Sequence, residues 1–356
     1  MTVSTAHVPG AWMAAEIAEQ PAALRRTLDA LLPLVPDVAR LAASTRQVLF
    51  IARGSSDAAA HYGRYLVEVT AGRPAGSASP SVATLYRRRM DLSGVLAVAL
   101  SQSGRTAEIV ETLGWAAGCG ASTVAITNDG TSPLAAAADL ALVTAAGPER
   151  ALPATKTYTA QLAALAVLAL GLGAPGELRS EVDRTPDVVA GLLNGTDADP
   201  LALALSDVDG VVVSGRGFAS STAWELSLKV RETCGLDASG LSYADLLHGP
   251  IAVIKERTPA LLVAADDGPA LPGVLALARR LRAAGAPVHC IGGGPALAAE
   301  CVVALAGPGL PERVAPIGLV VPGQLAVAAL AARLGLDPDA PPGLAKVTQT
   351  DDGEAE

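Results

Sequence analysis

Aromatic residues are scarce in this sequence. They make up 3% of the 356 residues, whereas hydrophobic residues as a whole make up 51%. Aliphatic side chains must therefore build the core. The chain is long enough for two domains of ordinary size.

Basic residues are also few. Lysine and arginine number 26 against 35 aspartates and glutamates, and the net charge is −9. Binding to nucleic acid through its phosphates needs a basic surface, so we expect no nucleic-acid partner. The densest basic run, Arg87-Arg88-Arg89, is short and is explained by a solvated loop.

Signals for metal binding, secretion and membrane insertion are weak or missing. The four scattered cysteines form no CxxC pair, which argues against a zinc site and favours reduced thiols in a cytosolic protein. Glu16 and Glu19 stand where a secretory signal would be basic and apolar. The longest apolar stretches, residues 162–174 and 317–334, are predicted to be buried helices. We therefore expect a cytoplasmic protein with no membrane partner.

Nucleotide-binding and acyl-transfer motifs are incomplete or missing. Gly215-Arg216-Gly217 begins a GxG pattern, but Ser220 occupies the position of the third glycine. The sequence has no Walker A lysine motif and no GxSxG elbow. These gaps argue against a bound nucleotide and against a Ser-His-Asp triad.

Short apolar runs alternate with helical patterns along the chain. Several of the runs end in loops of small or polar residues, and they include residues 47–52, 94–100, 122–127, 210–214, 258–264 and 287–291. This alternation predicts an α/β fold in which helices cover both faces of parallel sheets.

The pattern occurs twice. Arg53 and Arg216 follow equivalent strands, Gln161 and Gln324 lie in equivalent helices, and both pairs are 163 residues apart. An internal duplication predicts two similar sheets packed together. The expected organisation is N-terminal helices (1–45), a first domain (46–175), a linker with one helix (176–200), a second domain (201–335) and a tail (336–356).

The SQSGRT loop, residues 101–106, lies between a predicted strand and a predicted helix. Its hydroxyls, its amide and the free N–H groups of a helix N-terminus favour an anion, typically phosphate. Ser55 and Ser56 stand at the end of a neighbouring strand and could join this site. Ordinary helix capping by serine or threonine is the alternative.

Residues 222–250 carry the densest set of reactive side chains. Helical spacing puts Glu225, Lys229 and Glu232 on one face, and a predicted loop carrying His248 follows. Two carboxylates, an amine and an imidazole suit proton transfer on a small polar substrate. The alternative is a surface helix with one ion pair and a solvated loop histidine.

Five motifs in this order resemble a known family. They are the SQSGRT loop, Ala154-Thr155-Lys156, ELSLKVRE (225–232), LLHGP (246–250) and LAK (344–346). Together they resemble double sugar-isomerase (SIS) domain proteins, in particular the isomerase half of glucosamine-6-phosphate synthase and SIS-type glucosamine-6-phosphate deaminases. The resemblance covers about residues 45–350. It implies two tandem SIS domains, each a parallel flavodoxin-like sheet with helices on both faces.

The resemblance also implies roles for individual residues. Glu232 matches the base that moves a proton between C1 and C2, and Lys346 matches a tail lysine near the carbonyl carbon. His248 matches a ring-opening residue that reaches the site from the neighbouring subunit. Lys229 and Glu225 match charged groups lining the site. The implied sugar-phosphate pocket consists of Ser56, Ser101, Gln102, Ser103 and Thr106, beside Ser55.

Two departures from the family pattern affect the expected activity. Ala154 stands where the synthase has a serine that contacts substrate, which puts the fine sugar specificity in doubt. The chain begins Met1-Thr2-Val3 without an N-terminal cysteine, so we expect no glutaminase activity.

The function implied is an aldose-ketose isomerising deaminase that needs no metal or redox cofactor. It would convert glucosamine 6-phosphate to fructose 6-phosphate and ammonia, as a homodimer with shared active sites. A fructosamine-phosphate deglycase and a plain phosphosugar isomerase are close alternatives. A non-catalytic sugar-phosphate sensor is the alternative from another class.

Overall fold

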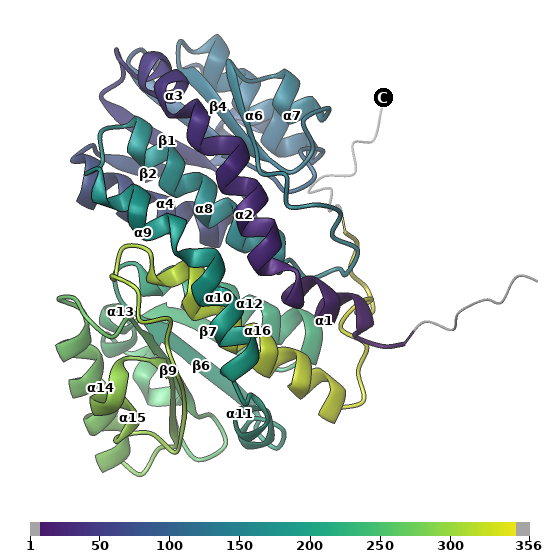
Figure 1. Cartoon of the computed structure of the whole chain (residues 1–356), viewed down its shortest axis with the longest axis vertical. Helices are drawn as coiled ribbons and strands as arrows, with labels where there is room; N and C mark the ends of the chain where they lie inside the picture. The colour runs from purple at the N-terminus through teal and green to yellow at the C-terminus, as the bar shows by residue number, and fades with distance from the viewer. Residues whose placement is uncertain (1–7, 347–356) are drawn as a thin grey trace, which may run out of the picture.

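The computed structural model describes residues 8–346 and has two sheets separated by a layer of helices (Figure 1). The chain begins with the helices α1 (Ala11–Ala18) and α2 (Gln20–Leu31), followed by the short helix η1 (Leu32–Leu34) and by α3 (Val35–Leu41). The N-terminal region is thus helical, as the sequence predicted.

The first sheet has five parallel strands. They are β1 (Gln47–Ile51), β2 (Ala75–Ser77), β3 (Val95–Leu100), β4 (Ser122–Thr127) and β5 (Leu140–Val143), in the order β2-β1-β3-β4-β5. The helices that go with this sheet are α4 (Ser55–Ala71), α5 (Pro80–Thr84), α6 (Ala107–Gly118), α7 (Pro133–Ala136) and α8 (Lys156–Gly171).

The second sheet also has five parallel strands. They are β6 (Gly210–Gly215), β7 (Asp237–Ser242), β8 (Ala260–Ala264), β9 (Val288–Gly292) and β10 (Val303–Leu305), in the order β10-β9-β8-β6-β7. Its helices are α12 (Ala219–Cys234), α13 (Tyr243–Leu247), η2 (Pro250–Val253), α14 (Leu271–Ala283), α15 (Gly294–Ala298) and α16 (Ala315–Arg333).

The two sheets have the same topology when their strands are numbered from the start of each half. Arg53 and Arg216 follow the first strand of each sheet, and Gln161 and Gln324 lie in the long helices α8 and α16. The structure therefore agrees with the duplication inferred from the 163-residue offset.

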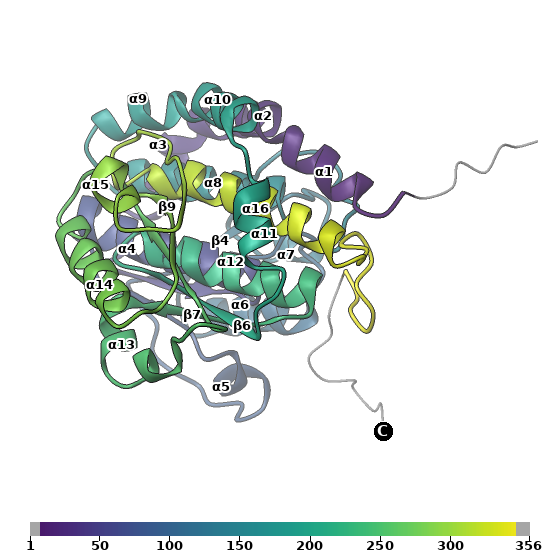
Figure 2. The same cartoon turned by 90° about the horizontal axis from the view of Figure 1, so that it is seen from below.

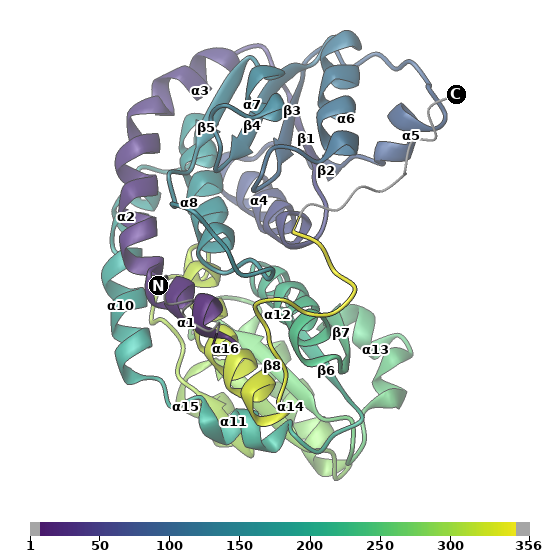
Figure 3. The same ribbon diagram turned by 90° about the vertical axis from the view of Figure 1, so that its right-hand side faces the viewer.

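Four helices fill the space between the sheets. Figure 3 shows α4 and α8 against the first sheet and α12 and α16 against the second, and Figure 2 shows α12 and α16 side by side. A Cβ atom on Gly323 of α16 would lie 2.5 Å from Leu226 of α12, so the close approach of these helices requires glycine there. One apolar cluster runs through this layer from sheet to sheet. Strands β3 and β8 are buried along their whole length, which explains their continuous apolar sequences.

The last helix, α16, is long and apolar enough to cross a membrane by length and composition alone. However, 78% of its most apolar window is buried inside the protein. It is a core helix, as predicted for residues 317–334, and it runs from Ala315 to Arg333 with Pro322 inside it.

The predicted linker is mostly helical, which corrects the expectation of a single helix there. It contains α9 (Glu177–Asp183) and α10 (Thr185–Gly195), and α11 (Asp199–Ala204) follows. Pro186 and Pro200 lie in the first turns of α10 and α11, where a missing N–H group costs nothing. The segment was predicted to be a linker partly because of these prolines, but they lie at helix starts.

Three strands were not predicted from the sequence. These are β2, β7 and β10, and β7 and α13 replace much of the loop expected after Gly235. All three strands lie at sheet edges. Edge strands are short or polar because one side is open, so they lack the apolar run by which the other strands were predicted.

Candidate active site

Helix α12 carries a buried row of charges. Lys229 has 1% of its side chain exposed and Glu225 has none. The Lys229 Nζ atom lies 3.6 Å from Oε1 of Glu225 and donates a hydrogen bond to Oε2 of Glu232. Glu232 is 21% exposed. The alternative of a solvated surface helix is therefore wrong.

Burial controls the protonation of this row. It raises the pKa of the Glu225 carboxyl group from its ordinary value of 4.5 to about 7. The Lys229 charge opposes this rise and the Glu232 charge adds to it. Burial disfavours the charge of Lys229, but the carboxylates of Glu225 and Glu232 outweigh it and raise the pKa of Lys229.

A cavity of about 600 Å³ lies at the carboxyl ends of β1 and β3, beside the last turns of α12. Parallel sheets of this kind bind ligands at that edge. The cavity is lined by Arg53, Gly54, Ser56, Leu100, Ser101, Gln102, Ser103, Thr106, Ile109, Leu152, Glu232, Ala345 and Lys346. It thus brings together side chains from the first half, from the second half and from the tail.

The SQSGRT loop forms one wall of the cavity and leads into α6. The hydroxyl of Ser101 accepts a hydrogen bond from the Gly104 N–H group at 3.1 Å and lies 3.5 Å from that of Thr106. Gly104 has φ +63°, and a Cβ atom there would lie 2.2 Å from Oγ of Ser132, so the turn requires glycine. Thr106 precedes α6 but makes no side-chain cap. This weakens the capping alternative and leaves the helix N-terminus available to an anion.

The two serines after β1 have different surroundings. Ser56 lines the cavity, and its hydroxyl accepts a hydrogen bond from Nε2 of Gln161 at 3.0 Å. Ser55, the first residue of α4, is not among the cavity-lining residues; its hydroxyl helps to lower the pKa of Glu225.

The tail brings Lys346 into the cavity. Its Nζ atom lies 2.6 Å from the carbonyl oxygen of Ala151, 3.2 Å from Oε2 of Glu149 and 3.3 Å from the carbonyl oxygen of Leu152. These three acceptors match the three N–H donors of an ammonium group. Residues 347–356 of the predicted tail lie outside the described residues.

Glu149 is a site residue that the sequence reasoning missed. Its buried carboxylate accepts hydrogen bonds from the N–H groups of Thr155 at 2.9 Å and Thr157 at 3.1 Å, at the start of α8. It therefore caps α8 and anchors Lys346 at once. The available signal was an acidic residue just before the Ala154-Thr155-Lys156 motif.

Asp339 is a second residue that was missed, and it fixes the tail. Its carboxylate accepts hydrogen bonds from the N–H groups of Trp12 at 3.0 Å and Met13 at 2.7 Å. Helix α1 has no side-chain cap of its own, so the tail caps it. The carbonyl oxygen of Asp339 also accepts a hydrogen bond from Leu152 at 3.0 Å. Figure 3 shows the tail running from α16 back past α12 towards the first sheet.

Four of the predicted site residues do not line the cavity, namely Ser55, Glu225, Lys229 and His248. Glu225 and Lys229 lie inside the protein, because the cavity meets α12 only at its C-terminal end, where Glu232 lies. Lys229 contacts Glu232 instead. His248 follows α13 and is exposed. The structure therefore unites Ser56, the 101–106 loop, Glu232 and Lys346, and leaves His248 outside the cavity of its own chain.

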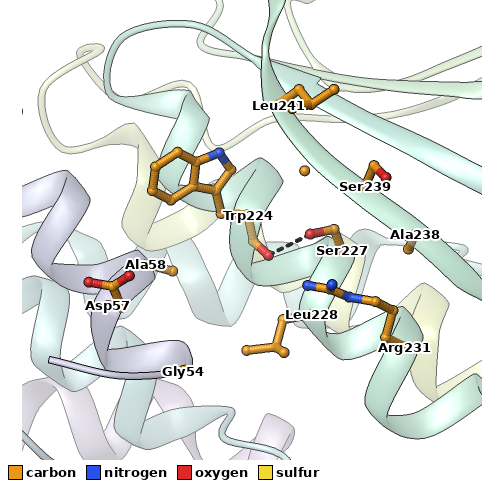
Figure 4. Close-up of a pocket in the computed structure, with 11 residues that line it drawn as sticks. Gly54, Asp57, Ala58, Trp224, Ser227, Leu228, Arg231, Ala238, Ser239 and Leu241 are labelled. Atoms are coloured by element: carbon orange, nitrogen blue, oxygen red, sulfur yellow. Dashed lines mark hydrogen bonds between the residues drawn. The ribbon is translucent and has the colours of Figure 1, made fainter. Parts of the chain in front are cut away.

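A second groove, of about 420 Å³, adjoins this cavity and shares Gly54 with it. Figure 4 shows it between Asp57 of α4, the α12 side chains Trp224 and Arg231, and the edge strand β7. The Ser227 hydroxyl donates a hydrogen bond to the Trp224 carbonyl oxygen at 2.8 Å and so faces its own helix.

Comparison with known proteins places these features in a family. A model of the SIS domain matches residues 41–171. It identifies one SIS domain where two were expected. The chain is 34% identical over 348 residues to the isomerising glutamine–fructose-6-phosphate aminotransferase of Methanothermobacter thermautotrophicus. The match covers 94% of this chain but 57% of that relative, so the chain spans little more than half of the relative's length.

Solved structures match nearly the whole chain. A protein from Silicibacter pomeroyi DSS-3, proposed to be a phosphosugar isomerase, is 33% identical with a TM-score of 0.84, covering 93% of this chain and all of that one. The C-terminal domain of glucosamine-fructose-6-phosphate aminotransferase from Francisella tularensis is 26% identical with a TM-score of 0.83. The match covers 96% of this chain and 100% of that domain. Glucosamine-6-phosphate deaminase from Thermotoga maritima shares the fold, with a TM-score of 0.75 and 23% identity. The match covers 95% of this chain and 100% of that one.

Proposed function

Because this chain belongs to the SIS domain family, we propose that it is an enzyme that isomerises and deaminates an amino-sugar phosphate. The substrate that fits the expectation best is glucosamine 6-phosphate, with fructose 6-phosphate and ammonia as products. The observation that carries this proposal is that one cavity holds the hydroxyl-rich loop 101–106, the carboxylate of Glu232 and the amine of Lys346.

The loop 101–106 holds the phosphate in this proposal. Ser101, Ser103 and Thr106 supply hydroxyls, and the uncapped N-terminus of α6 supplies N–H groups and a partial positive charge. Ser56 and Gln102 remain to contact the sugar hydroxyls. An extended hexose phosphate then reaches from the loop to Glu232 and Lys346 on the other walls.

Glu232 is the base of the proposed reaction. It removes the C2 proton of the open-chain 2-amino aldose and returns it to C1. The amine gives up one N–H proton and O1 gains one, so that a ketimine stands at C2 and a hydroxyl at C1. Water hydrolyses the ketimine to the ketose and ammonia. Lys229 holds the Glu232 carboxylate in place by its hydrogen bond, and Lys346 stabilises the negative charge that develops on O1. Proton transfer by a positioned group is worth about 10²–10⁴ in rate.

A second copy of the chain completes the site in this proposal, because ring opening needs an acid-base group and His248 lies outside the cavity. The segment around His248 exposes apolar side chains, with Leu247 39% and Val253 51% exposed. The loop after α5 exposes Leu85 and Tyr86 by 65% and 77%. Exposed apolar side chains of this size are typical of interaction surfaces. The groove of Figure 4 offers a way into the cavity for the partner's loop.

We also propose that the second half is a diverged copy of the first and does not bind phosphate. The strand order is the same in both sheets. Ala265, Asp266 and Asp267 follow β8, where Ser101, Gln102 and Ser103 follow β3. Two carboxylates at that position would repel a phosphate.

A plain phosphosugar isomerase is the second candidate, favoured by the 33% identity to the Silicibacter pomeroyi protein. The test incubates the protein with glucosamine 6-phosphate and measures ammonia and fructose 6-phosphate separately. Equal amounts of both support the deaminase, and their loss in Glu232→Gln ties the activity to this site. Ketose formation from a sugar phosphate without ammonia would favour the isomerase. Binding without turnover of any amino-sugar or sugar phosphate would favour a sensor.

A further inference from the structure

Arg53 lines the cavity, and the proposed reaction gives it no role. It follows β1, and its side chain is 48% exposed. Its Nε atom lies 3.0 Å from Oε2 of Glu108, and a terminal nitrogen lies 3.1 Å from Oε1. This is a two-point contact between a guanidinium and a carboxylate, which fixes the plane of the arginine.

Glu108 creates an electrostatic problem for an anion at this site. It lies in the first turn of α6, the helix whose N-terminus faces the cavity, and its side chain is 9% exposed. A sugar phosphate brings about 1.5 to 2 further negative charges to the same place. A cation must therefore offset both groups if the phosphate is to bind there.

Few cations are placed to do so among the described residues. Of the residues that line the cavity, Arg53 and Lys346 are the positively charged ones. Lys346 is assigned to O1, at the other end of the substrate, in the proposed reaction, and its Nζ atom lies against Glu149 and two carbonyl oxygens. A guanidinium has five N–H donors, and the contact with Glu108 uses two of its nitrogens. Arg53 is thus the cation with donors to spare.

We propose that Arg53 contacts the substrate's phosphate with the N–H groups that Glu108 does not use. Glu108 then holds the guanidinium at the cavity wall, and the site prefers phosphorylated sugars over free sugars. This inference rests on the proposed function for the nature of the substrate, but it concerns phosphate binding and can be tested without turnover.

The experiment titrates inorganic phosphate, and separately glucosamine 6-phosphate, into the intact protein by calorimetry. Arg53→Gln is expected to weaken both by about 10- to 100-fold, the range for a lost hydrogen bond to a charged group. The matched control is Arg257→Gln, since Arg257 is 51% exposed, pairs with Asp209 at 2.9 Å and does not line the cavity. It is expected to change affinity by less than about threefold, the small effect typical of an exposed, screened charge.

Combining Arg53→Gln with Glu108→Gln distinguishes a direct contact between Arg53 and the phosphate from mere neutralisation of the Glu108 charge by Arg53. Glu108→Gln removes the repelling carboxylate, so it is expected to keep or improve phosphate affinity. Adding Arg53→Gln to it should still cost about tenfold in phosphate affinity, because the direct contact between Arg53 and the phosphate is lost. This double variant also avoids leaving the Glu108 carboxylate without its contact to Arg53, which protects its fold.

Three results would overturn the inference. The first is equal phosphate affinity in Glu108→Gln and the double variant, which would limit Arg53 to neutralising Glu108. The second is an equal loss in the Arg53 and Arg257 variants, which would indicate a long-range field. The third is unchanged affinity in Arg53→Gln. Absence of ammonia release by the wild-type protein would instead refute the proposed deaminase and leave these affinities as the test of Arg53.

Discussion

Replacing Glu225 by glutamine tests whether this buried carboxyl group holds a proton near neutral pH. Burial raises its pKa from 4.5 to about 7, and no part of the side chain is exposed to solvent. The folded protein therefore binds a proton that the unfolded chain releases at lower pH. The stability that this proton contributes is fully present below pH 4.5 and is lost as the pH rises towards 7.

The magnitude follows from the two pKa values. One pKa unit corresponds to about 1.36 kcal/mol, so between pH 5 and pH 8 the carboxyl group should cost the wild type roughly 2 to 3 kcal/mol of unfolding free energy. Glutamine has nearly the same shape and does not titrate. As the pH rises from 5 to 8, the variant Glu225→Gln should therefore become more stable relative to wild type by about that amount.

The assay is denaturant unfolding at several pH values, followed by circular dichroism. Glu111→Gln removes a carboxylate that is 42% exposed and serves as the control for the loss of one negative charge. The difference in unfolding free energy between wild type and Glu225→Gln should change by roughly 2 to 3 kcal/mol over this pH range. Parallel curves for these two proteins between pH 5 and pH 8 would refute the reasoning, because the carboxyl group would then titrate alike in both states.

The remaining predictions concern the site and the tail. Glu232→Gln should lower kcat by about 10²–10⁴ with an unchanged fold, measured by product formation; near-normal kcat would exclude it as the base. Ser103→Ala should raise KM more than it lowers kcat, and an unchanged KM would remove it from the phosphate site. Asp339→Ala should cost about 1 kcal/mol, since α1 loses its cap. It should also speed proteolysis of the tail and lower kcat by displacing Lys346; unchanged cleavage would refute this. Refolding Glu232→Gln with His248→Asn should restore about a quarter of wild-type activity if sites are shared, whereas no recovery after proven exchange would place His248 in its own chain's site.

The strands and long helices of the central layers could be predicted from local patterns. Buried strands such as β3 and β8 read as apolar runs because both faces are covered, and α12 read as a helix because its charges recur at helical spacing. The 101–106 loop was evident for the same reason, since hydroxyls and a glycine stand between a strand and a helix. Such patterns need only neighbouring residues, and these predictions agree with the structure.

The environment of each charge was decided by tertiary structure. Spacing put Glu225, Lys229 and Glu232 on one face of α12, but it could not tell that Glu225 and Lys229 are buried while Glu232 reaches the cavity. Burial depends on which helices pack against that face. The raised pKa of Glu225 follows from the packing, and nothing in its sequence neighbourhood indicates it.

Contacts between distant segments were also beyond the sequence. Asp339 caps α1 through Met13, 326 residues earlier in the chain, and Glu149 anchors Lys346 from 197 residues away. An acidic residue in a polar tail has the same local pattern whether it is solvated or caps a helix. The sequence by itself determined the alternation of strands and helices, the duplication and the hydroxyl loop, because these are local or periodic. Only the tertiary structure decided which charges meet, because hydrogen bonds and desolvation depend on distance in space.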